Sequence, residues 1–302
     1  MANITEMNKI LTIFLMTEKG YHFLVHTAKK YQALFGLVVV GNDKSLQKDY
    51  EEEIITFCQQ QQIPFVKKSD FKAVTTEYVM AIAWRWMIKH SADKLIVFHD
   101  SLLPKYRGFS PLINALLNKE KEIGVSAIFG ADEFDRGAMI AQSATQIRYP
   151  IKIADAIRCI NNNYLEVAET VLACLLAGKA LMAVPQNEAE ASYSIWRDER
   201  DYAIDWRQSA DEICRLIDAV GYPYKGAYTR WEGQTVRIYD AVAVNDVKIE
   251  QRHCGKLIFV DDAKPVIICG TGLLKIMDAE IEDGDKRIPF FPLSKFRIRF
   301  TD

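Results

Sequence analysis

The sequence predicts an α/β protein: a Rossmann-like, mostly parallel sheet with helices on both faces, followed by a small C-terminal β-rich, OB-like domain. In the first two-thirds of the chain, short apolar β-rich runs alternate with helix-like stretches, which is the pattern of βαβ units. The last third carries many short β-like runs separated by turn residues, as in small barrels or sandwiches. The length of 302 residues exceeds what one core usually carries.

The first predicted domain spans residues 1–203. Its strands are expected to be continuous apolar runs, because a parallel sheet covered on both faces buries both sides of each strand. The predicted strands are Ile10–Met16, Leu37–Val40, Ile63–Lys67, Tyr78–Ala83, Leu95–His99, Gly124–Phe129 and Met139–Ile147. Tyr50–Gln61 is polar and rich in helix formers, and Ile153–Leu176 has helical periodicity that stops before Gly178.

The second predicted domain spans residues 204–302. It opens with a short amphipathic helix over Asp211–Val220, which Gly221 and Pro223 end. Turns such as Glu232-Gly233 and Asp283-Gly284 separate the β-like runs that follow. These runs are Ala227–Trp231, Val236–Tyr239, Lys256–Val260, Val266–Cys269, Leu273–Ala279 and Phe296–Phe300.

Composition and charge exclude several classes of protein. The formal net charge is −2 and the sequence pI is near 6.3, which argues against nucleic acid as the main partner, because phosphate binding needs a basic surface. None of the six cysteines forms a C-x-x-C pair, so we expect free thiols in a reducing compartment and no zinc or disulfide framework. No apolar run reaches the ~18 residues of a membrane span. Ile10–Met16 is read as a strand and not as a signal peptide, which predicts a cytoplasmic protein.

The end of the strand Leu95–His99 is the predicted ligand crevice. The usual glycine-rich signatures are missing, since the sequence contains neither a Gly-x-Gly-x-x-Gly after its first strand nor a P-loop. In doubly wound sheets, ligands bind at the carboxyl ends of the strands. Leu95–His99 ends in a histidine and opens the polar and aromatic loop His99–Gly108, where function tends to lie.

His99 and Asp135 are the candidate catalytic residues. Asp135 lies in the loop between two predicted strands, and it can reach His99 if those strands neighbour the His99 strand. A carboxylate beside an imidazole can form a proton shuttle or stabilise a developing oxyanion. Taken alone, His99 is also explained as a satisfied histidine at a strand end, and Asp135 as a turn residue before Gly137. No metal site is predicted, because the pair His22 and His26 lacks a third ligand.

The loop His99–Gly108, followed by Gly124-Val125 and Asp135-Arg136-Gly137, resembles the 10-formyltetrahydrofolate-dependent formyltransferases. The resemblance continues through Ile204-Asp205-Trp206 and Pro223–Thr229, which look like the entry to the C-terminal domain of methionyl-tRNA and sugar-nucleotide formyltransferases. It covers roughly the whole chain and is strongest to the sugar N-formyltransferases.

The resemblance assigns the family's catalytic histidine and aspartate to His99 and Asp135, but the family's asparagine is replaced by Val97. In the family mechanism the acceptor amine attacks the formyl carbon, and asparagine and histidine stabilise the oxyanion. Losing one such donor costs roughly 3–4 kcal/mol of transition-state stabilisation when nothing replaces it. Three interpretations stay open: another group replaces the donor, the enzyme is slow, or the protein binds folate without transferring the formyl group.

The family resemblance also implies a donor site for 10-formyltetrahydrofolate, the cosubstrate. Two segments are expected to line it, Ala83–Ile88 and Gly130–Asp135. The candidate donor-binding residues are Trp84, Arg85, Trp86, Met87, Ile88, Gly130, Asp132 and Phe134. The two tryptophans could flank a pterin ring or belong to the core, and Arg85 could meet the folate tail.

The predicted acceptor is a nucleotide-linked amino sugar. Initiator-tRNA enzymes carry a basic insertion after the second strand, whereas Gly41–Gln62 is net acidic here and would repel phosphate. The basic strand face over 295–299 is read as a solvated edge. The candidate acceptor-binding residues are Lys105, Tyr106, Arg107, Tyr222, Tyr224 and Lys225. The alternatives are a methionyl-tRNA formyltransferase, an aminoacyl-type formyltransferase and a non-catalytic folate-binding protein. The sequence predicts no membrane partner and does not settle the oligomeric state.

Overall fold

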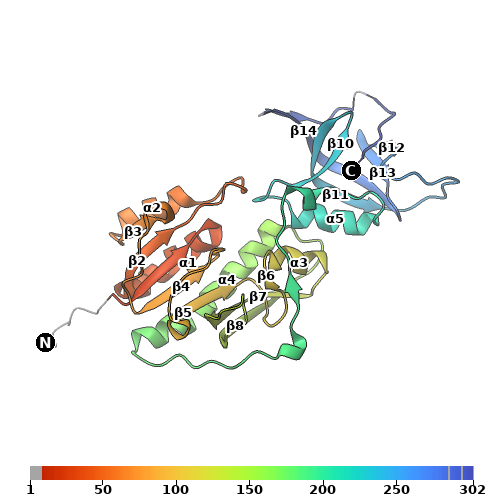
Figure 1. Ribbon diagram of the computed structural model, residues 1–302. Helices are drawn as coiled ribbons and strands as arrows, with labels where there is room; N and C mark the ends of the chain where they lie inside the picture. Colours follow the sequence, from red (N-terminus) through yellow and green to blue (C-terminus); the bar gives the residue numbers. More distant parts are fainter. Residues whose placement is uncertain (1–8, 285, 294, 302) are drawn as a thin grey trace. The chain divides into compact units, whose positions relative to one another are not determined.

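A seven-stranded sheet organises the first part of the chain (Figure 1). The computed structural model describes residues 9–284, 286–293 and 295–301. Across the sheet the strands are β3 (Phe65–Lys67), β2 (Phe35–Val40), β1 (Leu11–Leu15), β4 (Tyr78–Ile82), β5 (Leu95–His99), β7 (Glu122–Phe129) and β8 (Met139–Gln146). β1 to β5 run parallel, whereas β7 pairs antiparallel with both β5 and β8. The predicted α/β class with a mostly parallel sheet is confirmed.

Helices α1 (Thr17–Tyr31) and α4 (Ile153–Leu176) cover one face of this sheet. Phe98 of β5 contacts Phe23 of α1 and stacks on Tyr164 of α4, with ring centroids 5.8 and 5.7 Å apart. Because side chains alternate along a strand, Val97 and His99 point to the opposite face. Two further α-helices lie among the described residues of this part. Helix α2 (Glu51–Gln60) forms where Tyr50–Gln61 favoured a helix, whereas the short α3 (Pro111–Leu117) was not predicted.

Loop segments cover the His99 face of the sheet. Phe14, Val39 and Val79 form a buried cluster on that face, and partly buried side chains from the connections pack against it. Those side chains include Phe71, Val74, Trp84 and Ile88. Loops therefore cover the face of the sheet that carries His99, and loops are the segments where binding residues are often found.

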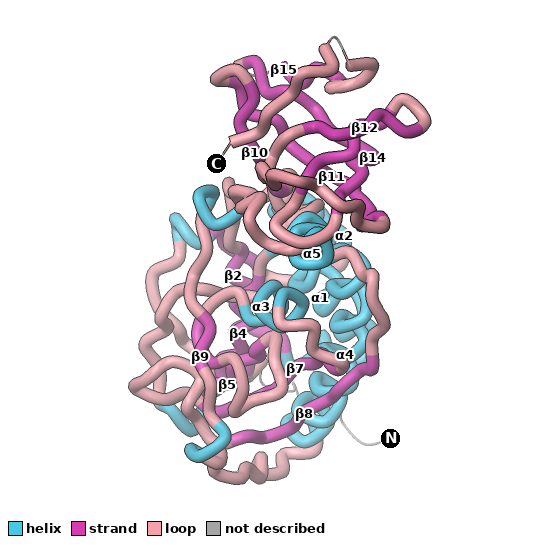
Figure 2. The backbone as a smooth tube through the Cα atoms, turned by 90° about the vertical axis from the view of Figure 1, so that its right-hand side faces the viewer, coloured by secondary structure: helices cyan, strands magenta, loops and turns pink. Residues whose placement is uncertain are grey.

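The chain divides into two units. One comprises the residues up to Ala115, Glu120–Ile147 and Asp155–Trp196, and the other comprises Leu116–Lys119, Arg148–Ala154 and the residues from Arg197 on. The tube in Figure 2 shows strands and helices mixed in the first unit and mostly strands in the second. Of the helices that the described residues form, none is long and apolar enough to cross a membrane.

The second unit is built on an antiparallel sheet, which confirms the predicted β-rich domain. Its strand order is β10 (Ala227–Trp231), β11 (Gln234–Val244), β14 (Leu273–Asp283), β13 (Lys264–Ile268) and β12 (Leu257–Asp261), and β15 (Lys286–Pro289) pairs with β14. Helix α5 (Ala210–Ala219) contacts β11 and β14. A capping box between Ser209 and Glu212 starts this helix, as its sequence favours.

One predicted strand is wrong. Phe296–Phe300 alternates basic and apolar residues, but only an isolated bridge from Arg299 to Lys256 forms within it. Ile298 and Phe300 are buried whereas Phe296 is 59% exposed. The alternating pattern therefore arises because two apolar side chains are buried, and not because the segment pairs with another strand along its length. β15 was missed because all four of its residues are exposed, so it has no apolar pattern.

Candidate active site

His99 ends β5 with its side chain almost fully buried. Its Nε2 lies 2.7 Å from the carbonyl oxygen of Tyr106. A carbonyl only accepts hydrogen bonds, so Nε2 carries a proton in this arrangement. The other ring nitrogen, Nδ1, lies 3.5 Å from Oδ1 of Asp135. The imidazole is thus held by the backbone on one side and faces a carboxylate on the other.

Asp135 lies in the connection from β7 to β8. Because β7 is antiparallel to β5, this connection begins beside Leu95 at the start of β5, and its path brings Asp135 back to His99. Its carboxylate Oδ2 accepts a hydrogen bond of 2.8 Å from the Gly108 N–H. Its backbone is left-handed, with φ of 58°, a conformation that costs energy for a residue other than glycine. Neighbouring Gly137 has no room for a side chain, because a Cβ there would lie 1.7 Å from the Phe129 carbonyl oxygen.

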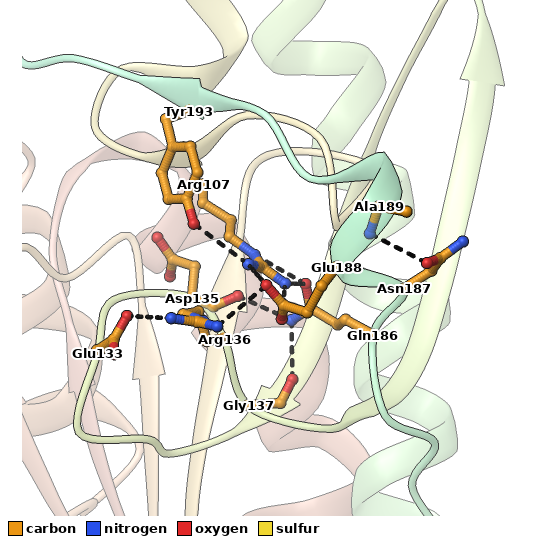
Figure 3. Close-up of polar contacts among 10 residues, drawn as sticks. All are labelled: Arg107, Glu133, Asp135, Arg136, Gly137, Gln186, Asn187, Glu188, Ala189 and Tyr193. Atoms are coloured by element: carbon orange, nitrogen blue, oxygen red, sulfur yellow. Dashed lines mark hydrogen bonds and ion pairs between the residues drawn. The ribbon is translucent and has the colours of Figure 1, made fainter.

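Gln186 and Arg107 support the Asp135 loop (Figure 3). The Gln186 amide nitrogen donates to the carbonyl oxygens of Asp135 and Gly137, both at 2.8 Å. Its amide oxygen accepts from Nε and Nη2 of Arg107, at 3.1 and 2.8 Å. Arg107 is fully buried and pairs through both terminal nitrogens with Glu188, at 2.9 Å. The guanidinium is therefore occupied by protein partners.

Ser126 of β7 holds the loop after His99 by two hydrogen bonds. The Ser126 hydroxyl donates to the Ser101 carbonyl at 2.7 Å and accepts from the Leu103 N–H at 3.1 Å. Gln142 of β8 donates both to this hydroxyl and to the Leu103 carbonyl. These bonds fix the path of the loop that places the Tyr106 carbonyl against His99.

Val97 lies in an apolar row of the sheet. It is paired with Ala81 of β4 and with Ile128 of β7, and paired residues on adjacent strands share a face of the sheet. The position that carries asparagine in the resembled family is thus flanked by two apolar side chains here. Neither neighbour can donate a hydrogen bond in its place.

A buried ionic cluster behind His99 was not predicted from the sequence. Lys19 in the first turn of α1 pairs with Asp100, and the Tyr164 hydroxyl of α4 donates to the same carboxylate. Burial alone would raise the pKa of Asp100, but the charge of Lys19 and the hydrogen bonds outweigh it and hold that pKa below its ordinary value. Burial and the Asp100 charge raise the pKa of the Tyr164 hydroxyl, so the tyrosine stays protonated.

The candidate donor-binding residues of the first segment, Ala83–Ile88, differ in their surroundings. Trp84 contacts Phe14 and Trp86 at ring-centroid distances of 5.1 and 4.9 Å, and Ile88 packs on the buried cluster of the His99 face. Trp84 Nε1 is buried without a hydrogen-bond partner in the described residues. Arg85 pairs with Asp43 at 2.9 Å, and Met87 is 61% exposed.

The second donor segment follows β7. Gly130 packs tightly against Leu95, since a Cβ there would approach the leucine side chain to 2.9 Å. Asp132 is exposed. Phe134 is half exposed, and its ring lies 5.4 Å from that of Phe109 in the loop after His99. This segment therefore joins the strand end to the Asp135 loop.

The candidate acceptor residues divide between the two units. In the first, Lys105 is exposed and the Tyr106 hydroxyl donates to Glu120 at 2.8 Å. In the second, Tyr222 is 45% exposed, Tyr224 contacts Tyr202, and Lys225 pairs with Glu199 at 3.1 Å. The role of these residues in acceptor binding stays a prediction. Among the described residues, no group of three or more His, Cys, Asp or Glu side chains could hold a metal ion.

The fold and the site together define an α/β protein with a histidine–carboxylate pair at the carboxyl end of its sheet, joined to an antiparallel β-rich unit. Residues 65–172 match the family described as "Formyl transferase", and residues 198–288 match "Formyl transferase, C-terminal domain". The chain therefore belongs to the formyl transferase family, as the sequence resemblance implied.

Known proteins resemble this chain over different shares of its length. A methionyl-tRNA formyltransferase of Methylobacillus flagellatus is 32% identical over 192 residues, which are 62% of this chain and 59% of that one. The sugar 3N-formyl transferase WlaRD, solved with dTDP and 5-N-formyl-THF, has a TM-score of 0.64 and 20% identity, and covers 88% of this chain and 97% of its own. The N-formyltransferase of Helicobacter canadensis, solved with folinic acid and dTDP-3-aminofucose, has a TM-score of 0.63 and 18% identity over 88% and 98% of the two chains.

The sequence relatives and the solved structures support different statements about the chain. The chain spans a little over half the length of the curated relatives it matches, with 55% and 59% of the first two covered. The solved structures are at most 20% identical to it, so they show the same fold.

Proposed function

We propose that the protein transfers a formyl group from 10-formyltetrahydrofolate to the primary amine of a nucleotide-linked amino sugar. The observation that carries the proposal is the approach of His99 Nδ1 to Asp135 Oδ1 at 3.5 Å at the carboxyl end of β5. This is the position where doubly wound sheets bind ligands. The family to which the chain belongs supplies the reaction, formyl transfer.

In the proposed reaction, the neutral acceptor amine attacks the formyl carbon of the donor. The carbonyl π bond becomes an oxyanion, and the attacking nitrogen must then lose a proton. Asp135 and His99 take up this proton. The oxyanion then re-forms the carbonyl double bond as the C–N10 bond breaks, and the pair returns a proton to N10 of the folate. The products are the N-formyl amine and tetrahydrofolate.

Val97 removes the side-chain donor that would share the oxyanion with His99. When His99 is doubly protonated, the Nε2 proton is bonded to Tyr106 and the Nδ1 proton lies on the side of Asp135. The Nδ1 proton can stabilise the oxyanion of the intermediate before this proton is transferred. We propose that a backbone N–H, a water or another side chain supplies the second donor.

The donor site fits a heteroaromatic ligand in one respect. Trp84 Nε1 is a buried donor without a partner in the described part of the chain, and such a group costs free energy unless something accepts its hydrogen bond. An acceptor atom on a pterin ring would satisfy it. Arg85 and Asp43 would have to separate before this arginine could meet a folate tail.

An amino sugar suits the surface better than a tRNA. Gly41–Gln62 contains five acidic and two basic residues, so it is net acidic, and the cations Lys48, Lys67 and Arg85 are already paired with Glu53, Glu51 and Asp43. This segment would repel a phosphate backbone. Two fold neighbours are sugar formyltransferases. The names of the curated relatives favour a second candidate, methionyl-tRNA formyltransferase.

The domain organisation and location complete the proposal. We propose that residues 1–203 form the catalytic domain and residues 204–302 an OB-like domain whose Tyr222, Tyr224 and Lys225 border the acceptor. The cytoplasm is the proposed location.

Mass spectrometry tests the proposal directly. The protein would be incubated with 10-formyltetrahydrofolate and a panel of acceptors: UDP- and dTDP-linked 3- and 4-amino sugars and initiator methionyl-tRNA. We expect one formyl mass to be added to an amino sugar and none to the tRNA. If only the tRNA is formylated, the protein is a methionyl-tRNA formyltransferase and the amino-sugar proposal is wrong. Donor binding without product on any amine would favour a non-catalytic folate-binding protein.

A further inference from the structure

The Gln186 side chain joins the Asp135 loop to the buried Arg107, and its amide makes four hydrogen bonds in doing so. Its amide nitrogen has two protons, and they go to the carbonyl oxygens of Asp135 and Gly137, both at 2.8 Å. Its amide oxygen accepts twice from Arg107. The amide is thus fully satisfied, and it links three segments that lie far apart in the sequence (Figure 3).

The Asp135 loop needs such support. Asp135 has a left-handed backbone, with φ of 58°, which persists only when the surroundings determine it. Without Gln186, the carbonyl groups on either side of Arg136 would lose the donor that fixes their direction. The bond from the Gly108 N–H to the carboxylate, the ion pair of Arg136 with Glu188 and the ring contact of Phe134 with Phe109 would remain, but none of them fixes the direction of these two carbonyl groups.

From this geometry we propose that Gln186 is a positioning residue for Asp135 and sets the distance between that carboxylate and His99. The inference rests on the proposed function, because it assigns Asp135 a part in proton transfer. Gln186 itself does not touch the reacting atoms. Displacing a reacting group by about 1 Å can cost about 100-fold in rate, so the two hydrogen bonds are expected to act on turnover and not on substrate binding.

The anchor of Gln186 is rigid. Arg107 is fully buried. Its ion pair with Glu188 and the pairing of strand β6 (Arg107–Gly108) with strand β9 (Tyr193–Ser194) hold it in place. Because Arg107 holds Gln186 in one place, the two hydrogen bonds that Gln186 donates hold the Asp135 loop in one place as well. Gln186, Glu188 and Tyr193 thus support the site, although they come long after Asp135 in the sequence.

Two substitutions separate the donor role of Gln186 from its contact with Arg107. In Gln186→Glu the ionised carboxylate keeps an acceptor for Arg107 but has no proton to donate. In Gln186→Met both contacts are lost without a new charge. Gln32→Glu is the matched control, because Gln32 also donates to a backbone carbonyl, that of Gln61, but at an exposed position after α1.

We expect kcat to fall by about 100-fold in both Gln186 variants, with KM for donor and acceptor changed less than about twofold, and no change in Gln32→Glu. Full kcat in Gln186→Glu with a loss only in Gln186→Met would overturn the proposal, since the contact with Arg107 would then be what matters. An equal rise in both KM values without a change in kcat would overturn it as well.

Hydrogen exchange tests the positioning role without turnover. Backbone amides of residues 130–138 should exchange faster in both Gln186 variants than in the wild type or in Gln32→Glu. Unchanged exchange there would contradict the inference even if the enzyme is active. Faster exchange in a protein that formylates no amine would instead leave the positioning role standing and count against the proposed function.

Discussion

His99 and Asp135 face each other across 3.5 Å, from Nδ1 to Oδ1, with their other polar atoms already engaged. The His99 Nε2 is bonded to the Tyr106 carbonyl and the Asp135 Oδ2 to the Gly108 N–H. Both partners come from one loop, the segment after β5. Each residue therefore has one atom fixed by the backbone and one atom left for the other residue or for a substrate.

The first prediction concerns this pair. His99→Ala should lower kcat for formyl transfer by about 10²–10³-fold through loss of oxyanion stabilisation. Asp135→Asn should lower it by about 10²–10⁴-fold through loss of a proton acceptor. Because the two act as a unit, the double variant should be little slower than the slower single one. Steady-state kinetics on the acceptor found by mass spectrometry would measure this.

Controls of the same residue types are available outside the site. His253 is exposed and Asp262 has a side chain 88% exposed, and both belong to the second unit. His253→Ala and Asp262→Asn should keep the wild-type rate. If His99→Ala and Asp135→Asn do so too, the assignment of the site is wrong.

The second prediction concerns Val97. Restoring the family residue by Val97→Asn places an amide between Ala81 and Ile128, and burying an amide that finds no partner costs about 1–3 kcal/mol. We expect lower stability in urea unfolding and no gain in kcat, because we propose that another group supplies the second donor. A variant that reacts faster than the wild type would show that the missing donor limits this protein.

The third prediction concerns Gly137. A Cβ at this position would lie 1.7 Å from the Phe129 carbonyl oxygen, and backbone atoms cannot move aside as the end of a side chain can. Gly137→Ala should therefore cost about 1–3 kcal/mol of stability and displace Asp135, so that kcat falls as well. Thermal unfolding would measure the first effect. Gly221→Ala is the control for stability, since its Cβ would meet nothing closer than 3.4 Å.

The sequence predicted the parts of the site that lie on one loop after one strand, and missed those that depend on distant segments. His99 follows a buried apolar run and opens a dense motif, so its place at a strand end could be read directly. Gln186 lies 51 residues from Asp135 and Tyr164 lies 64 from Asp100, and neither residue type is distinctive alone. The one available signal was Asp100, a charged residue directly after a buried strand.

The fold was predictable for a related reason. Strands buried on both faces leave continuous apolar runs, and β1, β2, β4 and β5 were found that way. Exposed β15 leaves none. Phe296–Phe300 shows the opposite error, because two buried side chains at alternate positions imitate a strand.

The last prediction concerns the pH dependence contributed by Asp100. Its pKa is lower in the folded protein than the ordinary value of 3.8, so the unfolded chain binds the proton more readily. The stabilisation is therefore fully present above about pH 4 and is lost as the pH falls through the folded pKa. Asp100→Asn should remove this dependence, and at pH 7 it should cost about 3–5 kcal/mol, because Lys19 is left as a buried charge without its partner.

Urea unfolding of the wild type and Asp100→Asn between pH 3 and pH 7 would measure the difference in stability between the two proteins. We expect that difference to be constant at neutral pH and to shrink below about pH 4. Tyr164→Phe serves as the second variant, since it removes one hydrogen bond to the carboxylate and leaves Lys19 in place. It should cost about 1.5–3 kcal/mol and keep the acid dependence. A difference between wild type and Asp100→Asn that does not vary with pH would show that Asp100 does not titrate in this range.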